Sequence, residues 1–329
     1  MPDLGPFVIA GLSTGAIYVL AGVGLVVLYR ASGVLNLAQG ALGALSAMIA
    51  WQIADSGGPQ WLGWIAAVAA ATALALLYGS FIAPRLATSD PIVRAVATLG
   101  FALIILGFCE FMWGEWPRAL RLPSDNVGFE LIGVRVTATR AIAFGLGLAV
   151  TVGMILFLNL TRLGLSMRAL ANDREISGLI GVPVLRVDAW AWVISGVLSG
   201  VSGIFLANMV RLQIIPLTYM VIPAVAAAIL GRLTSLTAVV IGGLVIGVLE
   251  AIASPFPEVS AYRSATPFVV AGLAQAQARA WRADAPCESP PRPTCDKVTK
   301  DQARFAICSS ASTRQYRWRP SARRKSPRR

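Results

Sequence analysis

Few residues in this chain could carry out chemistry, because most of the sequence is apolar. Histidine is absent, and the first lysine is Lys297. The apolar part of the chain therefore has no histidine for a general base, metal ligand or proton relay, and no lysine for a Schiff base. No GxxxxGK(S/T) phosphate-binding loop and no C-x-x-C pair occur in it. We expect no catalysis by this chain, no cofactor and no metal site.

One polar stretch, residues 160–182, stands between long apolar segments. Leu163, Met167 and Leu170 recur there at i, i+4 and i+7, which predicts a short helix with one apolar face. Gly181 is expected to end this helix. Four arginines lie at or near its ends: Arg162, Arg168, Arg174 and Arg186. The stretch is either an ordinary positively charged cytoplasmic loop or a docking surface for a cytoplasmic partner, and its own residues leave both interpretations open.

The composition places the chain among membrane proteins. Of its 329 residues, 56% are hydrophobic and 13% are charged, and the mean hydropathy is +0.69. Soluble domains carry about 25% charged residues. Several apolar runs approach or exceed the ~20 residues that cross a bilayer, so we predict an all-α polytopic membrane protein with about 7–8 transmembrane helices. Full spans are predicted at residues 5–29, 34–54, 62–83, 92–114, 138–160 and 187–208.

Residues 219–254 predict a broken or re-entrant helix rather than two full spans. The apolar run 221–231 is too short to cross a bilayer, a turn interrupts the chain, and the run 236–252 resumes. Interrupted helices inside membranes are tolerated only against protein or a water-filled path, so this segment is typical of a translocation pathway. Small residues spaced by four predict close helix packing elsewhere: Gly11/Gly15, Gly196/Gly200 and Gly243/Gly247.

The chain is expected to divide into a transmembrane domain, residues 1–272, whose last span is incomplete, and a basic tail, residues 273–329. The first part holds 14 Lys+Arg and 12 Asp+Glu, and the tail holds 14 and 4. The composition of the tail predicts disorder. Its charge suits anionic lipid or nucleic acid. The abrupt loss of hydrophobicity inside a span instead suggests a reading frame that shifts near Ala271 or Gly272. We expect contact with membrane lipid and no nucleic-acid partner.

Five residues in otherwise apolar sequence are candidates to line a solute path: the polar Asn36, Gln39, Thr98 and Ser235, and Gly40. The polar side chains could instead make interhelical hydrogen bonds, worth about 0.6 kcal/mol each in a membrane bundle. Glu110 and Glu250 are the acidic residues that we place within spans. Because both lie near span ends, we expect each to be a solvated interfacial glutamate. A proton-coupled carrier would place an acid at mid-membrane, so these positions disfavour that class.

The charges around the first span predict the orientation of the chain. No positive side chain precedes this span, and Arg30 follows it. The positive-inside rule therefore places the N-terminus outside the plasma membrane. The polar stretch 160–182 is then expected on the cytoplasmic side.

Three blocks of sequence carry a resemblance to the membrane permeases of branched-chain amino-acid ABC importers, most of all the shorter of the two permeases in such systems. The resemblance covers residues 5–271. In the first block, residues 11–50, the usual N-F-A-H-G-E lacks its His and its Glu. In the third block, residues 222–252, Arg232 replaces a usual Gly. The second block matches the cytoplasmic loop of the family at Thr161, Gly164, Arg168, Ala169, Asp173, Glu175 and Gly181, and departs from it at Ser177 and Gly178.

The resemblance implies an ABC importer permease fold in a bacterial inner membrane, serving branched-chain amino acids or related small polar solutes. It implies three kinds of partner: a second permease subunit, two cytoplasmic ATPases, and a periplasmic or extracellular solute-binding protein. It also implies that loop 161–183 is the coupling helix that sits in a groove of the ATPase. Arg168→Glu or Gly164→Trp is then expected to abolish ATP-coupled uptake while leaving membrane insertion intact.

Two other hypotheses stay open. The chain could be an ATP-independent secondary carrier or passive solute channel, or a non-functional truncated permease, because its last span is incomplete. The solute is also open, since branched-chain or other amino acids, urea and short amides are all handled by this type of permease. In such systems the binding protein carries most of the discrimination.

Overall fold

A computed structural model gives the structure of the chain, and it describes residues 5–120, 124, 128–131, 134–219, 221–255, 265–272 and 276. All of these belong to one compact unit, residues 1–282. Apart from Ala276, the predicted tail from residue 273 onward lies outside the described residues, as does the proposed shift of reading frame.

The described residues form an all-α membrane protein. Six helices are long and apolar enough to cross a bilayer: α1 (Gly5–Ser32), α3 (Gln60–Leu77), α4 (Pro91–Trp113), α5 (Ala138–Leu160), α8 (Val184–Met209) and α11 (Leu236–Ala253). A π turn (Tyr78–Ile82) and a 3-10 turn (Ala83–Leu86) extend α3. The predicted number of about 7–8 spans is not confirmed, because α2 (Gln39–Asp55) and the segment Ile214–Leu230 are shorter than these six. One small antiparallel hairpin, β1 (Gly128–Leu131) with β2 (Val134–Thr137), precedes α5.

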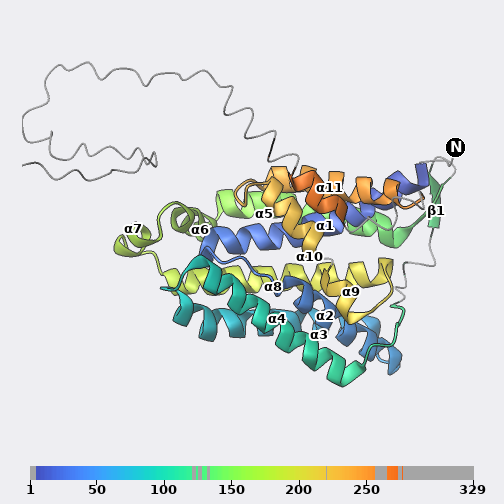
Figure 1. Cartoon of the computed structure of the whole chain (residues 1–329), viewed down its shortest axis with the longest axis horizontal. Helices are drawn as coiled ribbons and strands as arrows, with labels where there is room; N and C mark the ends of the chain where they lie inside the picture. The colour runs from blue at the N-terminus through green and yellow to red at the C-terminus, as the bar shows by residue number, and fades with distance from the viewer. Residues whose placement is uncertain are drawn as a thin grey trace, which may run out of the picture. The chain divides into compact units, whose positions relative to one another are not determined.

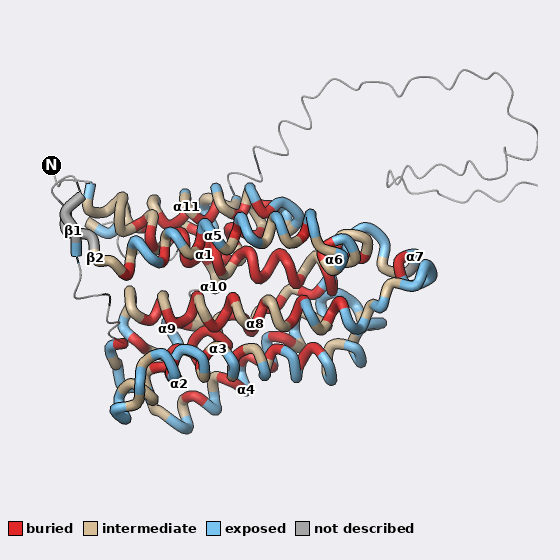
Figure 2. The backbone as a smooth tube through the Cα atoms, turned by 180° about the vertical axis from the view of Figure 1, so that it is seen from behind, coloured by how far each residue is buried: buried red, intermediate tan, exposed pale blue. Residues whose placement is uncertain are grey.

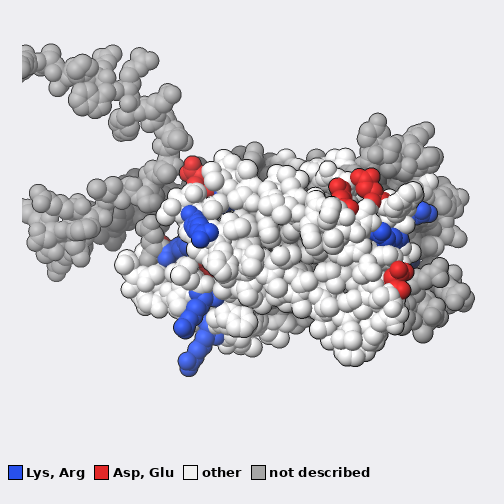
Figure 3. All heavy atoms as spheres, turned by 90° about the horizontal axis from the view of Figure 1, so that it is seen from below, with Lys and Arg blue, Asp and Glu red and all other residues white. Residues whose placement is uncertain are grey.

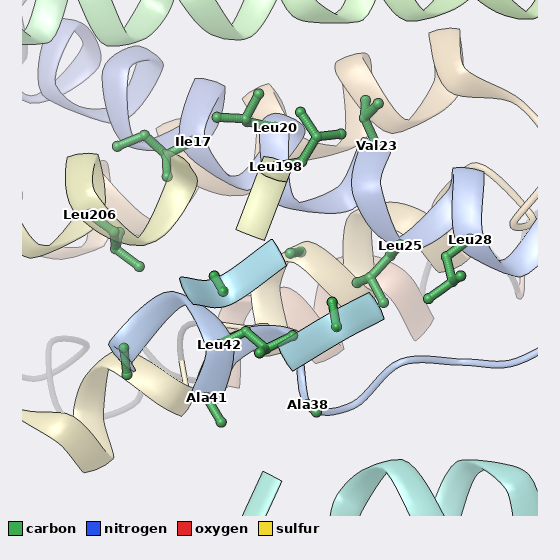
Figure 4. Close-up of a cluster of buried hydrophobic side chains, with 14 of the residues drawn as sticks. Ile17, Leu20, Val23, Leu25, Leu28, Ala38, Ala41, Leu42, Leu198 and Leu206 are labelled. Atoms are coloured by element: carbon green, nitrogen blue, oxygen red, sulfur yellow. The ribbon is translucent and has the colours of Figure 1, made fainter. Parts of the chain in front are cut away.

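Helix α1 lies at the centre of the bundle. It packs against α11, α5 and α10 on one side and against α8 on the other, and α8 in turn packs against α2 and α3 (Figure 1). Figure 2 shows α1 buried along most of its length, whereas the outer faces of α3 and α4 are exposed. The apolar side chains between α1, α2 and α8, including Leu25, Leu42 and Leu198, fill the core shown in Figure 4.

The predicted glycine contacts are confirmed. A Cβ atom built on Gly247 of α11 would lie 2.4 Å from the Cα atom of Gly15 of α1, so the two backbones touch. Gly11 faces Val248 and Gly15 faces Leu244, which shows that α1 and α11 run antiparallel. Gly203 of α8 meets Gly43 of α2 in the same way. In lipid, where association depends on close packing, such contacts hold helices together.

The predicted amphipathic helix is two helices rather than one: α6 (Arg162–Asn172) and α7 (Arg174–Leu179). The break falls at Asp173, whose backbone is extended (φ −153°, ψ 114°). The Asp173 Oδ1 atom accepts a hydrogen bond from the Ile176 backbone N–H at 3.0 Å, so its side chain begins a new helix. Both helices lie at the end of the bundle opposite the N-terminus and β1 (Figures 1 and 2).

The predicted break in the segment 219–254 is present. Helix α9 (Ile214–Tyr219) is followed by α10 (Val221–Leu230), by a turn, and then by α11, against which α10 packs. Arg232 and Leu233 in the turn have left-handed backbones, with φ of 52° and 57°. Glycine adopts this conformation without strain, whereas a side chain with a Cβ atom is strained there.

Candidate functional site

Helix α6 is fastened to the end of α5 by its first residues. The Thr161 Oγ1 atom accepts a hydrogen bond from the Gly164 backbone N–H at 3.0 Å and donates one to the Phe157 carbonyl at 2.7 Å. A Cβ atom on Gly164 would lie 2.5 Å from the Leu158 Cα atom, which leaves room only for glycine. Gly164 is therefore a packing residue. A Gly164→Trp variant would disrupt the fold of the loop itself, so it is a poor test of docking.

The other predicted coupling residues lie along the same two helices. Arg168 Nη1 donates to the Asn159 Oδ1 atom at 3.2 Å, which ties α6 again to α5. Ala169 is half-buried on α6, and Asp173 is the exposed cap of α7. Gly181 has φ of +90° and lies just beyond the end of α7. The backbone of Glu175 belongs to α7, and its side chain lies outside the described residues.

An ion pair that sequence reasoning missed connects α7 to the bundle. Arg174 of α7 pairs with Asp188 of α8, and its Nη1 atom donates to Asp188 Oδ1 at 3.2 Å and to the Ala31 carbonyl of α1 at 3.0 Å. Asp188 is only 9% exposed. It is also a third acidic residue within the membrane helices, so the prediction that the spans hold only Glu110 and Glu250 was wrong; the predicted span 187–208 already contained Asp188. The sequence does hold a signal for this ion pair, because Asp188 lies near the start of an apolar helix, directly after an arginine-rich loop.

The outer side of α6 and α7 carries apolar residues that the bundle does not cover. Ile176, Leu179 and Ile180 are 57%, 86% and 73% exposed, and Leu165 of α6 is 60% exposed. We call these four residues the end patch. Figure 3 shows an uncharged band along the middle of the bundle, with basic side chains gathered at the end that carries α6 and α7. Ile176, Leu179 and Ile180 lie within five residues of one another, and exposed apolar side chains grouped beyond the spans favour a protein-docking surface.

Gln39 connects three helices at the centre of the bundle. Its Nε2 atom donates to the Ala21 carbonyl of α1 at 2.5 Å, and its backbone carbonyl accepts from Ser199 Oγ of α8 at 2.5 Å. A longer contact of 3.5 Å joins Ser195 Oγ to Gln39 Oε1. Gln39 is 2% exposed. The structure therefore shows the interhelical hydrogen bonds that we considered as the alternative to a path-lining role.

Asn36 and Thr98 hold the extended segment between α1 and α2. The Asn36 Oδ1 atom accepts from the Ala38 backbone N–H at 3.1 Å, and Thr98 Oγ1 accepts from the Leu37 backbone N–H at 3.1 Å. Both side chains are fully buried. Because this segment is not helical, α2 begins at residue 39 rather than at the predicted residue 34. Ser235 is exposed, and its Oγ atom caps α11 by accepting from the Ala238 N–H at 3.3 Å, so it does not join the other candidates.

Glu250 is buried, and our prediction of a solvated interfacial glutamate was wrong for this residue. It is 6% exposed on α11, and the Tyr18 hydroxyl of α1 donates to its Oε2 atom at 2.8 Å. Tyr18 also lines a small cavity, together with Gln39 and Gly40. A Cβ atom on Gly40 would lie 2.3 Å from the Thr218 carbonyl, so the start of α2 packs directly on α9. Glu250 itself lines a larger cavity, of about 550 Å³, beside α9 and α10.

The uncharged band and the long apolar helices define a multi-pass membrane protein. A family model described as "Branched-chain amino acid transport system / permease component" matches residues 7–273. The chain belongs to this family and is a multi-pass protein of the inner membrane.

Curated relatives are distant but match over most of their length. The permease protein LivH of the high-affinity branched-chain amino acid transport system of Escherichia coli K12 is 25% identical over 266 residues, which cover 75% of this chain and 84% of LivH. BraD of Pseudomonas aeruginosa is 26% identical, with 76% and 87% covered. The putative glucose ABC transporter permease TsgC13 of Haloferax volcanii is 28% identical, with 60% and 61% covered. Among solved structures, PsaBC from Streptococcus pneumoniae in complex with Fab is 15% identical with a TM-score of 0.43, covering 82% of this chain and 89% of that one.

Proposed function

We propose that this chain is one of two permease subunits of an ABC importer for branched-chain amino acids or related small solutes. Two cytoplasmic ATPases bind to the end that carries α6 and α7, and a solute-binding protein delivers solute at the opposite end. The relatives named for branched-chain amino acid transport support the substrate class. The TsgC13 match shows that a similar permease carries the name of a glucose transporter, so the family alone leaves the solute open.

The end patch is the observation that carries this proposal. Its residues lie on α6 and α7, and several contacts connect these two helices to the bundle. Because of these contacts, a partner that binds the end patch and moves would also move the bundle. Gly164 and Thr161 join α6 to α5, and Arg174 joins α7 to α1 and α8. Closure of the ATPases on ATP would then shift α1 and α8, the helices that Gln39 connects. For the solute path to switch between inward and outward access, the ATPases must bind one state of the bundle more tightly than the other.

The distribution of charge supports the proposed orientation, with the N-terminus outside. Seven arginines lie at the ends of elements on the α6–α7 side: Arg30, Arg85, Arg94, Arg162, Arg168, Arg174 and Arg186. Among the side chains that the structure describes, the opposite end carries three arginines, Arg118, Arg140 and Arg211, together with Asp55, Glu110 and Glu115. The positive-inside rule then makes the α6–α7 end cytoplasmic, which is where an ATPase is available.

Uptake by the reconstituted complex tests the proposal. The chain, its second permease and the ATPases are placed in proteoliposomes, the solute-binding protein is added outside, and uptake of radiolabelled leucine is measured with and without ATP inside the vesicles. We expect uptake that requires ATP and that Leu179→Asp abolishes, because a charge in the end patch cannot be buried against the ATPase. The matched control is Ser56→Asp, which adds the same charge to an exposed turn at the opposite end and should leave uptake intact.

The buried pair of Tyr18 and Glu250 favours one alternative function. Proton-coupled carriers place acidic residues inside the membrane, and Glu250 is more deeply buried than its sequence position predicted. A secondary carrier would accumulate solute without ATP and would be indifferent to Leu179→Asp. ATP-independent uptake in the same proteoliposomes would therefore replace the importer with the carrier.

A further inference from the structure

Arginines from neighbouring helices gather at the C-terminal end of α1. Arg174 of α7 donates to the Ala31 carbonyl at 3.0 Å, and Arg94 of α4 donates to the Ser32 carbonyl at 3.5 Å. Because these two carbonyls belong to consecutive residues, both guanidinium groups lie at the last turn of α1. Two further arginines approach this turn, and we call the four the arginine cluster: Arg30, Arg94, Arg168 and Arg174.

The arginine cluster holds more positive charge than the described residues neutralise. Arg30 of α1 and Arg168 of α6 lie close enough for their charges to repel. Within the described part of the chain, the pair of Arg174 with Asp188 is the one salt bridge of the cluster, although other carboxylates lie at this end. Four guanidinium groups and one carboxylate leave three positive charges. The C-terminal end of a helix corresponds to about half a negative charge, so α1 offsets only a small part of this excess.

Burial distinguishes the arginine cluster from ordinary surface charge. Its four members are half-buried, whereas the other arginines described at this end are exposed: Arg85, Arg162, Arg186 and Arg232. The Nε atoms of Arg94 and Arg168 are shielded from solvent and donate to no acceptor among the described residues. A shielded cation without a partner is unfavourable. An anion bound at the exposed part of the cluster would offset this cost.

The arginine cluster lies at the depth of the lipid headgroups and borders a side of α4 that faces lipid. Arg30 is two residues from the end of α1, and Arg94 is the fourth residue of α4, so both lie at the ends of membrane-crossing helices. Val93 and Ile104, about 80–100° around α4 from Arg94, are 49% and 70% exposed. Gly100 between them has open space around it. This continuity with the lipid-facing surface favours a lipid over the ATPase as the occupant. Basic pockets between membrane helices bind anionic headgroups in this way.

We propose that the arginine cluster binds the phosphate group of an anionic phospholipid from the leaflet at the α6–α7 end. Guanidinium groups bind phosphate oxygens through paired hydrogen bonds, and the phosphate takes the place of the carboxylates that the cluster lacks. The acyl chains lie along the side of α4 that carries Val93 and Ile104. A zwitterionic phospholipid binds less tightly, because its own cationic group stays close to its phosphate. The site requires only that the chain lies in a membrane, so it is independent of the importer proposed above.

Native mass spectrometry of the purified full-length chain in a non-ionic detergent tests the proposal. The probes are phosphatidylglycerol and phosphatidylcholine with the same acyl chains, and inorganic phosphate as a soluble anion. We expect phosphatidylglycerol to bind more tightly than phosphatidylcholine by about tenfold or more, since one arginine near a membrane surface contributes about fivefold. Because the basic tail, residues 273–329, also suits anionic lipid, the readout is the change in preference that each substitution causes.

Two variants of the arginine cluster are compared with two matched controls. Arg30→Gln and Arg94→Gln should each reduce the preference for phosphatidylglycerol by about fivefold. Arg85→Gln and Arg162→Gln remove exposed arginines at the same end and should leave the preference unchanged.

Arg30→Gln also covers the case in which Arg94→Gln does not fold. The Arg30 side chain makes no hydrogen bond or ion pair with the residues that the structure describes, so its substitution breaks no such contact and removes the repulsion from Arg168. In phosphatidylcholine, the Tm of Arg30→Gln should therefore equal or exceed that of the wild type. A merely structural role of Arg30 would lower this Tm.

Four results would overturn the proposal. Two are equal binding of both lipids by the wild type and an unchanged preference in Arg30→Gln. A third is an equal loss of preference in Arg162→Gln, which would show a general effect of surface charge. The fourth is inorganic phosphate that displaces phosphatidylglycerol at equal concentration, which would assign the site to a soluble anion. If the two lipids bind equally and Arg30→Gln instead weakens binding of the ATPases, the cluster belongs to the ATPase interface.

Discussion

The ion pair between Arg174 and Asp188 is the contact through which α7 is tied to the membrane helices. Asp188→Ala removes the carboxylate and leaves the guanidinium with the Ala31 carbonyl. The two side chains are 34% and 13% exposed. Breaking a fully buried pair by removing one partner costs about 3–5 kcal/mol, whereas an exposed pair contributes about 0–1 kcal/mol. For this partly exposed pair we expect Asp188→Ala to lower the free energy of unfolding by about 2 kcal/mol.

Thermal unfolding of the full-length chain in detergent measures this loss. In a chain of this length 1 kcal/mol corresponds to about 2 °C, so Tm should fall by about 4 °C. A double-mutant cycle with Arg174→Met isolates the pair, and we expect a coupling energy of about 1–2 kcal/mol. The control is Arg186→Met, which removes an exposed arginine from α8, the helix that carries Asp188. This variant should leave Tm unchanged.

The same variants have a functional consequence. Because the pair carries movement from α7 to α1 and α8, Asp188→Ala should also reduce the solute taken up per ATP hydrolysed. Two results would refute this reasoning. One is a coupling energy below about 0.3 kcal/mol, which is the range of independent sites. The other is an unchanged transport stoichiometry in both single variants.

Three further substitutions test separate parts of the structure. Gly164→Ala should lower the free energy of unfolding by about 2 kcal/mol, because the new Cβ atom would clash with the α5 backbone. Gly178→Ala should not lower it, because the nearest atom to a Cβ there is 3.8 Å away. Equal Tm values for the two variants would contradict this packing. Arg232→Gly should raise Tm by about 2 °C by relieving a left-handed residue, and a lower Tm would show that the turn carries no strain. Gln39→Leu should cost about 1 kcal/mol through lost interhelical bonds. A changed preference among solutes would in addition support the predicted path-lining role, and an unchanged preference would count against it.

The membrane helices were predictable because their information is local. Length and hydropathy alone define a span, and the predicted span 138–160 coincides with α5. The turn at residues 231–235 was predictable for the same reason, since a short polar interruption in an apolar run is visible in the sequence. Composition left open only how many of the shorter apolar helices should be counted as spans.

The candidate site could be predicted only in part, because its contacts join distant residues. Tyr18 and Glu250 are 232 positions apart in the sequence. No local pattern indicates that the Tyr18 hydroxyl contacts the Glu250 carboxylate inside the bundle. The pair of Arg174 and Asp188 is closer in sequence, but it depends on the chain reversing at the end of α7. The break at Asp173 was missed because no glycine or proline interrupts residues 165–177, whereas the capping bond of Asp173 is what separates α6 from α7.

Cysteine cross-linking between α7 and an ATPase tests the central claim most directly. The four native cysteines, of which Cys109 is buried, are first replaced by serine. Leu179→Cys, on the most exposed residue of the end patch, is then compared with Ser56→Cys at the opposite end of the bundle. The account predicts a disulfide between residue 179 and a cysteine placed in the ATPase groove, formed in active complexes and changed in yield by ATP. An intact, active complex with no cross-link at residue 179, or with one at residue 56, would contradict it.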